Sequence, residues 1–305
     1  MNQSRSTVTL QSVPSMLMNR RDLLTAAAAL LVVNAHAEAP LPKPGCQTNG
    51  WDLDPRRFDL LLTALREMKE LEFQGFETNI RFVQPQLERL DQAKGQIDAT
   101  GLEFVGAHTG LPNYEGMGLE KAADAVGSLA AQARQFGARA LVVSHGGLAK
   151  NGQFSKPAME QKARMLDMAG RRCADAGVRL AYHNHQPEFQ NDAAEETGLL
   201  QLTDPKLVSL MFDIGHAWLA YPRAVEFFKQ HQERVFGLHV RDFHNRESVP
   251  LGQGEFPLRE LAAAIKSAGW HGWLIDEEER PDLAKKPGKA AVGPSRKTMQ
   301  EIFGI

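Results

Sequence analysis

The sequence predicts an α/β protein with the architecture of a single-domain (β/α)8 TIM barrel. Short apolar runs bounded by turn residues alternate along the chain with longer helical patterns, which is typical of βα units in a parallel sheet. Eight such units fit into residues 38–305, and that length suits one barrel domain. A doubly wound sheet is the alternative, but no Gly-x-Gly-x-x-Gly follows the first expected strand.

The expected strands are short apolar runs between turn signals. In chain order they are Gly45–Asn49, Gly75–Asn79, Leu102–His108, Ala138–Ser144, Val178–His183, Leu207–Asp213, Val235–Val240 and Gly272–Glu277.

Helical patterns lie between these strands. Residues Arg57–Leu71 place Leu61, Leu65 and Met68 on one face, and the stretches Lys121–Phe136 and Glu160–Ala176 are rich in Ala, Met and Leu. Glycine tolerates the left-handed backbone that ends many helices, so the glycines before the next strands are expected to end helices: Gly75, Gly101, Gly137, Gly177 and Gly272. The segment Asp282–Ser295 is expected to be a loose loop before a last short helix.

The first 37 residues have the composition of a signal peptide. Arg20-Arg21 precedes the apolar run Ala26–Val33, and an Ala-x-Ala end follows at Ala35–Ala37. The paired arginines match the twin-arginine type, so we predict a signal peptide over 1–37, a barrel over 38–305 and a periplasmic location. A membrane anchor is the alternative, but the apolar core is shorter than the roughly 18 residues of a spanning helix. We therefore expect no stable membrane span after cleavage.

Composition excludes several classes of protein. A formal net charge of -2 and 24% charged residues offer no basic surface for nucleic acid. Two cysteines, Cys46 and Cys173, cannot form a disulfide scaffold, and their separation is unlike a zinc-knuckle spacing.

Histidines and carboxylates gather where the expected strands end. In such a barrel the strand ends meet at one face, where active sites lie, and imidazole with carboxylate is a ligand set for zinc, manganese or cobalt. Because successive strand residues point to opposite faces, Glu277 and Glu278 cannot both point inward; Glu279 is expected to be a solvated loop residue. The residues concerned are His108, His145, His183, His185, His216, His239, Asp213, Glu277, Glu77 and Glu188.

Four segments carry a resemblance to a known family: Ala181–Phe189, Phe212–Ala217, Gly237–Asp242 and Gly272–Glu277. With them the chain resembles the xylose isomerase-like TIM barrels, the sugar phosphate isomerase/epimerase superfamily that also contains AP endonucleases. The likeness covers nearly all of residues 44–305. Each motif alone is weak evidence for the family, but the four motifs in this order and spacing are strong evidence together.

The resemblance implies one divalent metal ion, Mn, Co or Zn, held by Glu, Asp, His and Glu. The last three positions carry over to Asp213, His239 and Glu277. The first is His183 here, within a Tyr-His-Asn-His variant that resembles inosose dehydratases and lyases of 3-keto sugars. We favour His183 as the fourth ligand, with His185 and Glu188 as the alternatives.

The resemblance also implies proton abstraction next to a carbonyl and an enediolate intermediate. Candidate bases are Glu188 and Glu277, and His185 or His216 is the candidate acid or hydroxyl ligand. Arg241 is a further candidate catalytic residue that fixes polar substrate groups, and the residues assigned to substrate contacts are His108, Trp51, Glu77 and Asp242. A rim salt bridge is the alternative for Arg241 with Asp242, and packing of a loop side chain is the alternative for Trp51.

These inferences rank a metal-dependent sugar isomerase or epimerase first. A dehydratase or lyase that eliminates a beta oxygen from a keto sugar or 3-keto glycoside is the alternative, and a non-catalytic sugar-binding protein is the second alternative. The charge balance disfavours an AP endonuclease. We expect an unphosphorylated small-molecule sugar as substrate and no nucleic-acid partner. The sequence does not decide whether the chain forms a homo-oligomer.

Overall fold

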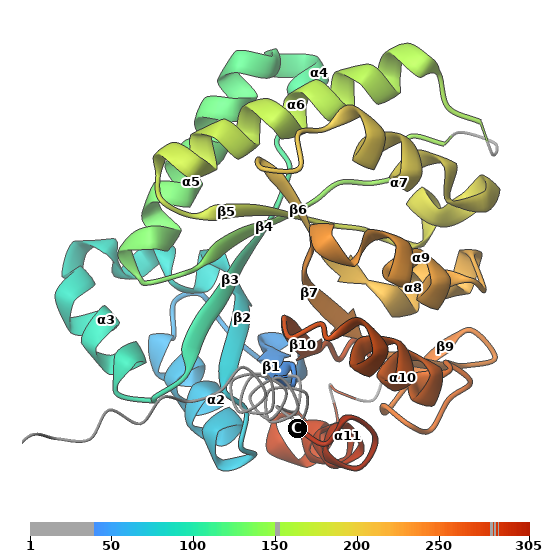
Figure 1. The fold of residues 1–305 in the computed structure, drawn as a ribbon. Coiled ribbons are helices and arrows are strands. Elements are labelled where there is room, and N and C mark those ends of the chain that lie inside the picture. The colour runs from blue at the N-terminus through green and yellow to red at the C-terminus, as the bar shows by residue number, and fades with distance from the viewer. Residues whose placement is uncertain (1–39, 150–152, 281–282, 284, 286) are drawn as a thin grey trace, which may run out of the picture. The chain divides into compact units, whose positions relative to one another are not determined.

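The computed structural model describes residues 40–149, 153–280, 283, 285 and 287–305. The signal peptide predicted for residues 1–37 lies outside them. Residues 40–305 form one unit, and its main sheet is a closed parallel barrel in the strand order β1-β10-β7-β6-β5-β4-β3-β2 (Figure 1). The strands are β1 Lys43–Gln47, β2 Gly75–Asn79, β3 Glu103–Gly110, β4 Ala140–Ser144, β5 Arg179–His183, β6 Val208–Asp213, β7 Val235–Val240 and β10 Trp273–Asp276. The predicted single-domain (β/α)8 barrel is confirmed.

Helices surround the barrel (Figure 1). The longer ones are α2 Phe58–Glu70, α3 Leu90–Asp98, α5 Leu119–Gln135, α6 Lys156–Asp175, α7 Gln190–Leu202, α9 Ala224–His231, α10 Leu258–Ala268 and α11 Lys289–Phe303. Shorter elements follow strand ends or precede strands: α4 Tyr114–Met117, α8 Ile214–Ala220, the 3-10 helices η1 Thr48–Gly50, η2 Ile80–Phe82, η3 Gln84–Arg89, η4 Gln186–Phe189 and η5 Gln232–Arg234, and the hairpin β8 Asp242–His244 with β9 Glu247–Val249. Of the helices that the structure describes, none has the length and apolar character needed to cross a membrane.

Three expectations about local structure are wrong. The first strand ends at Gln47, because Thr48–Gly50 turn into η1. Gly75 and Gly272 do not have the left-handed backbone that Gly137 has (φ 94°). Both allow close packing instead, since a Cβ would lie 2.6 Å from the Trp273 ring at Gly75 and closer still to the Trp270 ring at Gly272.

The chain end is also more helical than expected. Helix α11 begins at Lys289, within the segment predicted to be a loop. Val292, Met299 and Phe303 are buried along this helix. Burial of this face stabilises the helix despite Pro294, because tertiary packing outweighs local propensity.

The barrel interior is packed with apolar side chains. A separate cluster of buried residues fills it: Val105, Ala140, Val142, Ala181, Met211, Trp273 and Ile275. A larger cluster lies where the barrel packs against its helices. Polar side chains therefore collect at the carboxyl ends of the strands, where the interior packing stops.

Candidate metal centre

Four candidate ligands converge at the mouth of the barrel. His183 ends β5, Asp213 ends β6, His239 is the penultimate residue of β7 and Glu277 directly follows β10. These four strands are neighbours in the barrel, and Asp213 pairs in register with His239. One potential ligand atom from each residue lies within 4.8 Å of the other three, and all four side chains are buried. The structure thus brings together the ligand set expected from the sequence.

The donor atoms fit a divalent ion. Within the described part of the chain, His183 Nδ1, Asp213 Oδ2, His239 Nδ1 and Glu277 Oε2 are buried and make no hydrogen bond. His239 Nδ1 nevertheless lies 2.8 Å from Glu277 Oε2. Ligand atoms of a single metal site lie close together in this way, because all of them surround one centre. Buried polar atoms without partners are costly, and a bound cation would satisfy all four.

The two imidazoles of this set differ in their electrostatic surroundings. Burial lowers the pKa of His183 well below its ordinary value, against the opposing effect of Glu277. Burial by itself would also lower the pKa of His239, but the carboxylates of Glu277 and Glu77 outweigh it and raise that pKa. His183 is therefore the neutral ring that metal ligation requires, and a cation would replace the proton of His239.

Glu77 is fully buried beside this set and does not line the pocket described below. Its Oε2 lies 3.1 Å from His239 Nε2, and its Oε1 lies 3.3 Å from His108 Nδ1. Burial opposes its ionisation, but His239 and His108 lower its pKa to about 2. Glu77 thus contacts two histidines from behind, as carboxylates commonly do with metal-ligating histidines.

Strand alternation separates the acidic residues around Glu277. Asp276 and Glu278 are buried on the other side of the chain, where the Glu278 carboxylate accepts a hydrogen bond from Ser295 and pairs with Arg280 at 3.3 Å. The inference that only one of Glu277 and Glu278 points inward is confirmed.

Arg241 connects the candidate ligands to each other. Its guanidinium lies 3.1 Å from Asp213 Oδ2 and 2.7 Å from Glu277 Oε2, and donates to Glu279 at 2.9 Å. It also lies 3.0 Å from His216 Nε2. Arg241 is buried and His216 partly so, and neither lines the pocket. Arg241 thus forms a largely buried network rather than a rim salt bridge with Asp242.

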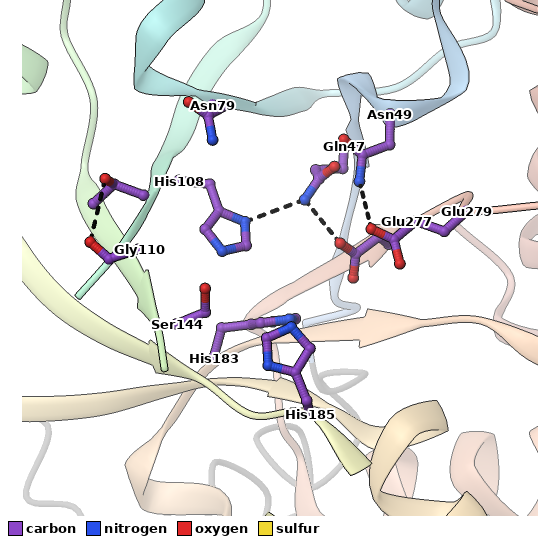
Figure 2. Close-up of a pocket in the computed structure, with 11 residues that line it drawn as sticks. Gln47, Asn49, Asn79, His108, Gly110, Ser144, His183, His185, Glu277 and Glu279 are labelled. Carbon is purple, nitrogen blue, oxygen red and sulfur yellow. Dashed lines mark hydrogen bonds between the residues drawn. The ribbon is translucent and has the colours of Figure 1, made fainter. Parts of the chain in front are cut away.

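A pocket of about 190 Å³ opens above the cluster (Figure 2). His108 and His185 line it on either side of His183, with ring centroids 5.0 and 4.9 Å from the His183 ring. The pocket is also lined by polar residues that were not predicted for the site: Gln47, Asn49, Asn79, Thr109, Ser144 and Glu279. Five of them stand in or next to expected strand ends, which was the available signal. Glu279 is exposed, as expected of a loop residue, and accepts a hydrogen bond from Asn49 at 3.2 Å.

The carboxylate of Glu188 does not reach this pocket. It accepts hydrogen bonds from the Tyr182 hydroxyl at 2.9 Å and the His185 backbone at 3.3 Å, and Lys162 Nζ lies 3.8 Å away. The side chain is fully buried against α6 and α7, in a cluster that includes Glu195. Glu188 is therefore in the wrong place for a base or a fourth ligand.

Asp242 has a structural role rather than the expected substrate contact. Its two carboxylate oxygens accept backbone N–H bonds from Phe243, Gly252, Gly254 and Phe256 at 2.9 to 3.0 Å. Its acceptor capacity is used in tying the β8–β9 hairpin to the loop that follows.

Trp51 also lies away from the pocket. Its indole N–H donates to Glu67 at 2.7 Å, and the residue lines a separate cavity with Leu283 and Pro287. The alternative explanation, packing of a loop side chain against the barrel, applies to Trp51.

The fold and this site define a class of protein: a parallel eight-stranded barrel with a His/Asp/His/Glu cluster at its mouth. Residues 65–302 match the family described as "Xylose isomerase-like TIM barrel". The chain belongs to this family.

The chain is similar in sequence to inosose dehydratases and in fold to several solved structures. The chain is 26% identical over 188 residues to an inosose dehydratase of Lacticaseibacillus casei, a match that covers 52% of this chain and 63% of that one. The chain thus spans less than two thirds of that relative. Two solved structures share the fold: the IolI protein with a bound zinc atom (TM-score 0.69, 14% identity, 86% and 98% of the two chains) and a 3-keto-D-glucoside 4-epimerase, YcjR, of E. coli (0.64, 16%, 87% and 100%).

Proposed function

We propose that the chain is a divalent-metal-dependent lyase that eliminates a beta oxygen from a keto sugar or a related keto polyol. The observation that carries the proposal is the set of four buried potential metal ligands, which lie within 4.8 Å of one another beside a pocket lined by two further imidazoles. The inosose dehydratase relative supports elimination. The first-ranked prediction, isomerisation or epimerisation, is not confirmed, and we place it second.

His183, Asp213, His239 and Glu277 would hold the ion. When bound, the ion supplies Lewis-acid polarisation of the substrate carbonyl and its neighbouring hydroxyl, which makes the adjacent C–H acidic. A histidine in place of a glutamate removes one negative charge from the set, so less of the ion's charge is neutralised. Arg241 holds Asp213 and Glu277 in position through its buried contacts.

His108 is the candidate base. Glu77 Oε1 and Gln47 Nε2 both lie 3.3 Å from its Nδ1 and fix the ring, so its Nε2 is the nitrogen proposed to take the proton. This is the base-and-orienter arrangement of many active sites. The base takes the proton alpha to the carbonyl.

His185 is the candidate acid, because it is the other imidazole beside His183 that lines the pocket. In the elimination the electron pair of the α C–H bond forms the new C=C bond and the β C–O bond breaks. The leaving oxygen takes a proton from His185. The products are an unsaturated ketone and water, or an alcohol from a glycoside. If the proton instead returns to the alpha carbon from the opposite face, the outcome is epimerisation, which is the second candidate.

Metal content tests the proposal first. Purified residues 38–305 should contain about one divalent ion per chain, and His239→Ala and Asp213→Ala should lose it. His271→Ala is the matched control, since His271 is exposed at the opposite end of β10. Absence of metal from the wild type after incubation with manganese, cobalt and zinc would refute the proposal.

Turnover then separates the two reactions. With inosose or a 3-keto glucoside in D2O, elimination forms a conjugated enone that absorbs in the ultraviolet, whereas epimerisation only exchanges deuterium into substrate. His108→Ala should abolish both signals while leaving metal content unchanged. Turnover retained in this variant would remove His108 as the base.

Export by the twin-arginine route is part of the proposal. An exported protein that folds before transport can carry metal loaded in the cytoplasm. Replacement of Arg20 and Arg21 by lysine should keep the protein inside the cell in a fractionation experiment, and unchanged export would refute this step.

A further inference from the structure

A second cavity, about 400 Å³ in volume, lies beside the candidate active site. The loops after β3 and β4 form it, with the start of α6. Ser144 lines the first pocket and the next residue, His145, lines the second cavity. Consecutive residues therefore line the two spaces, which places the second cavity next to the first pocket.

The second cavity contains a buried polar group without a partner. Tyr114 lines it and is 2% exposed, yet its hydroxyl makes no hydrogen bond with the described residues. Burial, with a contribution from Glu115, raises the pKa of Tyr114 to about 12, so the hydroxyl stays protonated as a donor. A buried hydroxyl without a partner costs free energy. A ligand oxygen in this cavity would recover that hydrogen bond.

The walls of the cavity are held in place. The backbone N–H of Leu148 donates to Glu195 at 2.7 Å, and Glu195 accepts from the buried Lys162 at 2.6 Å. Gly147 packs so closely on Pro187 that an added Cβ would lie 2.6 Å from it. A preformed wall of this kind is typical of a small-molecule site.

The lining selects against charge. Leu148, Phe154 and Ala158 supply apolar surface, and the only charged lining residue among those described is Glu115. Among the described lining residues, an anionic group would meet Glu115 and no Lys or Arg. A ring with apolar faces and a hydroxyl or ether oxygen suits both Phe154 and the Tyr114 hydroxyl.

We infer that the second cavity is a subsite for the neutral leaving group of a glycoside, either a second sugar ring or an aryl ring. The inference rests on the proposed function for the reaction in the first pocket, and it makes the substrate a keto glycoside. The bond that breaks joins the β carbon to the glycosidic oxygen. The alpha proton goes to His108, the oxygen takes a proton from His185, and the products are an enone and a free alcohol or phenol.

Binding of three probes tests the inference without turnover. Calorimetric titration of the metal-loaded protein compares methyl β-D-glucoside, cellobiose and phenyl β-D-glucoside. We expect at least one of the two larger probes to bind about tenfold tighter than the methyl glucoside. A gain with cellobiose alone assigns the subsite to a sugar ring, and a gain with the phenyl glucoside alone assigns it to an aryl ring. Equal affinity for all three would overturn the inference.

Two variants test whether the higher affinity of the larger probes comes from the second cavity. Tyr114→Phe should reduce the gain of the larger probe about threefold to tenfold, as expected for one hydrogen bond, and Phe154→Ala should reduce it through lost ring contact. Neither variant should change affinity for methyl β-D-glucoside; an equal loss for all three probes would refute the location.

Failure of the proposed function gives a different result. If a methyl 3-keto glucoside yields no enone while cellobiose or phenyl glucoside still gains affinity, the reaction is wrong and the subsite stands. If the enone forms but no larger probe gains affinity, the reaction stands and the subsite is wrong.

Discussion

The exchange Asp242→Asn distinguishes a structural aspartate from a substrate ligand. In the wild type, one carboxylate oxygen accepts N–H bonds from Gly252 and Gly254, and the other accepts from Phe243 and Phe256. An asparagine has the same shape but replaces one oxygen by an NH2 group, which cannot accept. Two backbone donors therefore lose their acceptor. Gly252 is exposed, so the amide should turn its NH2 group toward the glycine pair, where water can compensate in part.

The cost follows from the hydrogen bonds that are lost. Each is worth about 1 kcal/mol net, so the free energy of unfolding should fall by about 2 kcal/mol in urea denaturation. Metal content and the affinity for methyl β-D-glucoside should not change. Asp175→Asn is the matched control, because Asp175 is exposed at the end of α6, and it should stay within about 0.5 kcal/mol of wild type. Unchanged stability of Asp242→Asn together with weaker sugar binding would refute the structural role.

Three further predictions concern groups outside the pocket. Lys162→Met leaves Glu195 buried without its cation and should cost about 3 to 5 kcal/mol of unfolding free energy; a loss below about 1 kcal/mol would contradict the pairing. Burial and the neighbouring Glu188 raise the pKa of Glu196 from 4.5 to about 8. The protonated carboxyl therefore contributes at most ~5 kcal/mol to the free energy of unfolding. This contribution is complete below about pH 4.5 and is lost as the pH rises through about 8. Glu196→Gln should flatten the fall in stability between about pH 5 and about pH 9, and an unchanged profile would show that Glu196 titrates normally. Trp51→Phe removes the hydrogen bond to Glu67 and should cost about 1 kcal/mol without changing KM; a raised KM would restore Trp51 to the pocket.

Local patterns were sufficient for the barrel. Strand and helix periodicity are properties of neighbouring residues, and the strands Gly75–Asn79 and Val235–Val240 were predicted with their observed ends. Strand alternation also separated Glu277 from Glu278 before any coordinates were considered. The glycines and the last helix were less predictable. Gly75 is required by the nearby Trp273 ring, and α11 is stabilised by packing of its buried face.

The sequence by itself determined the kind of barrel and the strand-end residues at its mouth, since strand order and side-chain alternation fix where Asp213, His239 and Glu277 point. Only the tertiary structure decided which other mouth residues meet. Glu188 stands three residues after His185, yet its side chain packs beside Lys162 on another helix. A loop side chain takes its direction from partners far away in the chain, and those partners become neighbours only when the barrel closes.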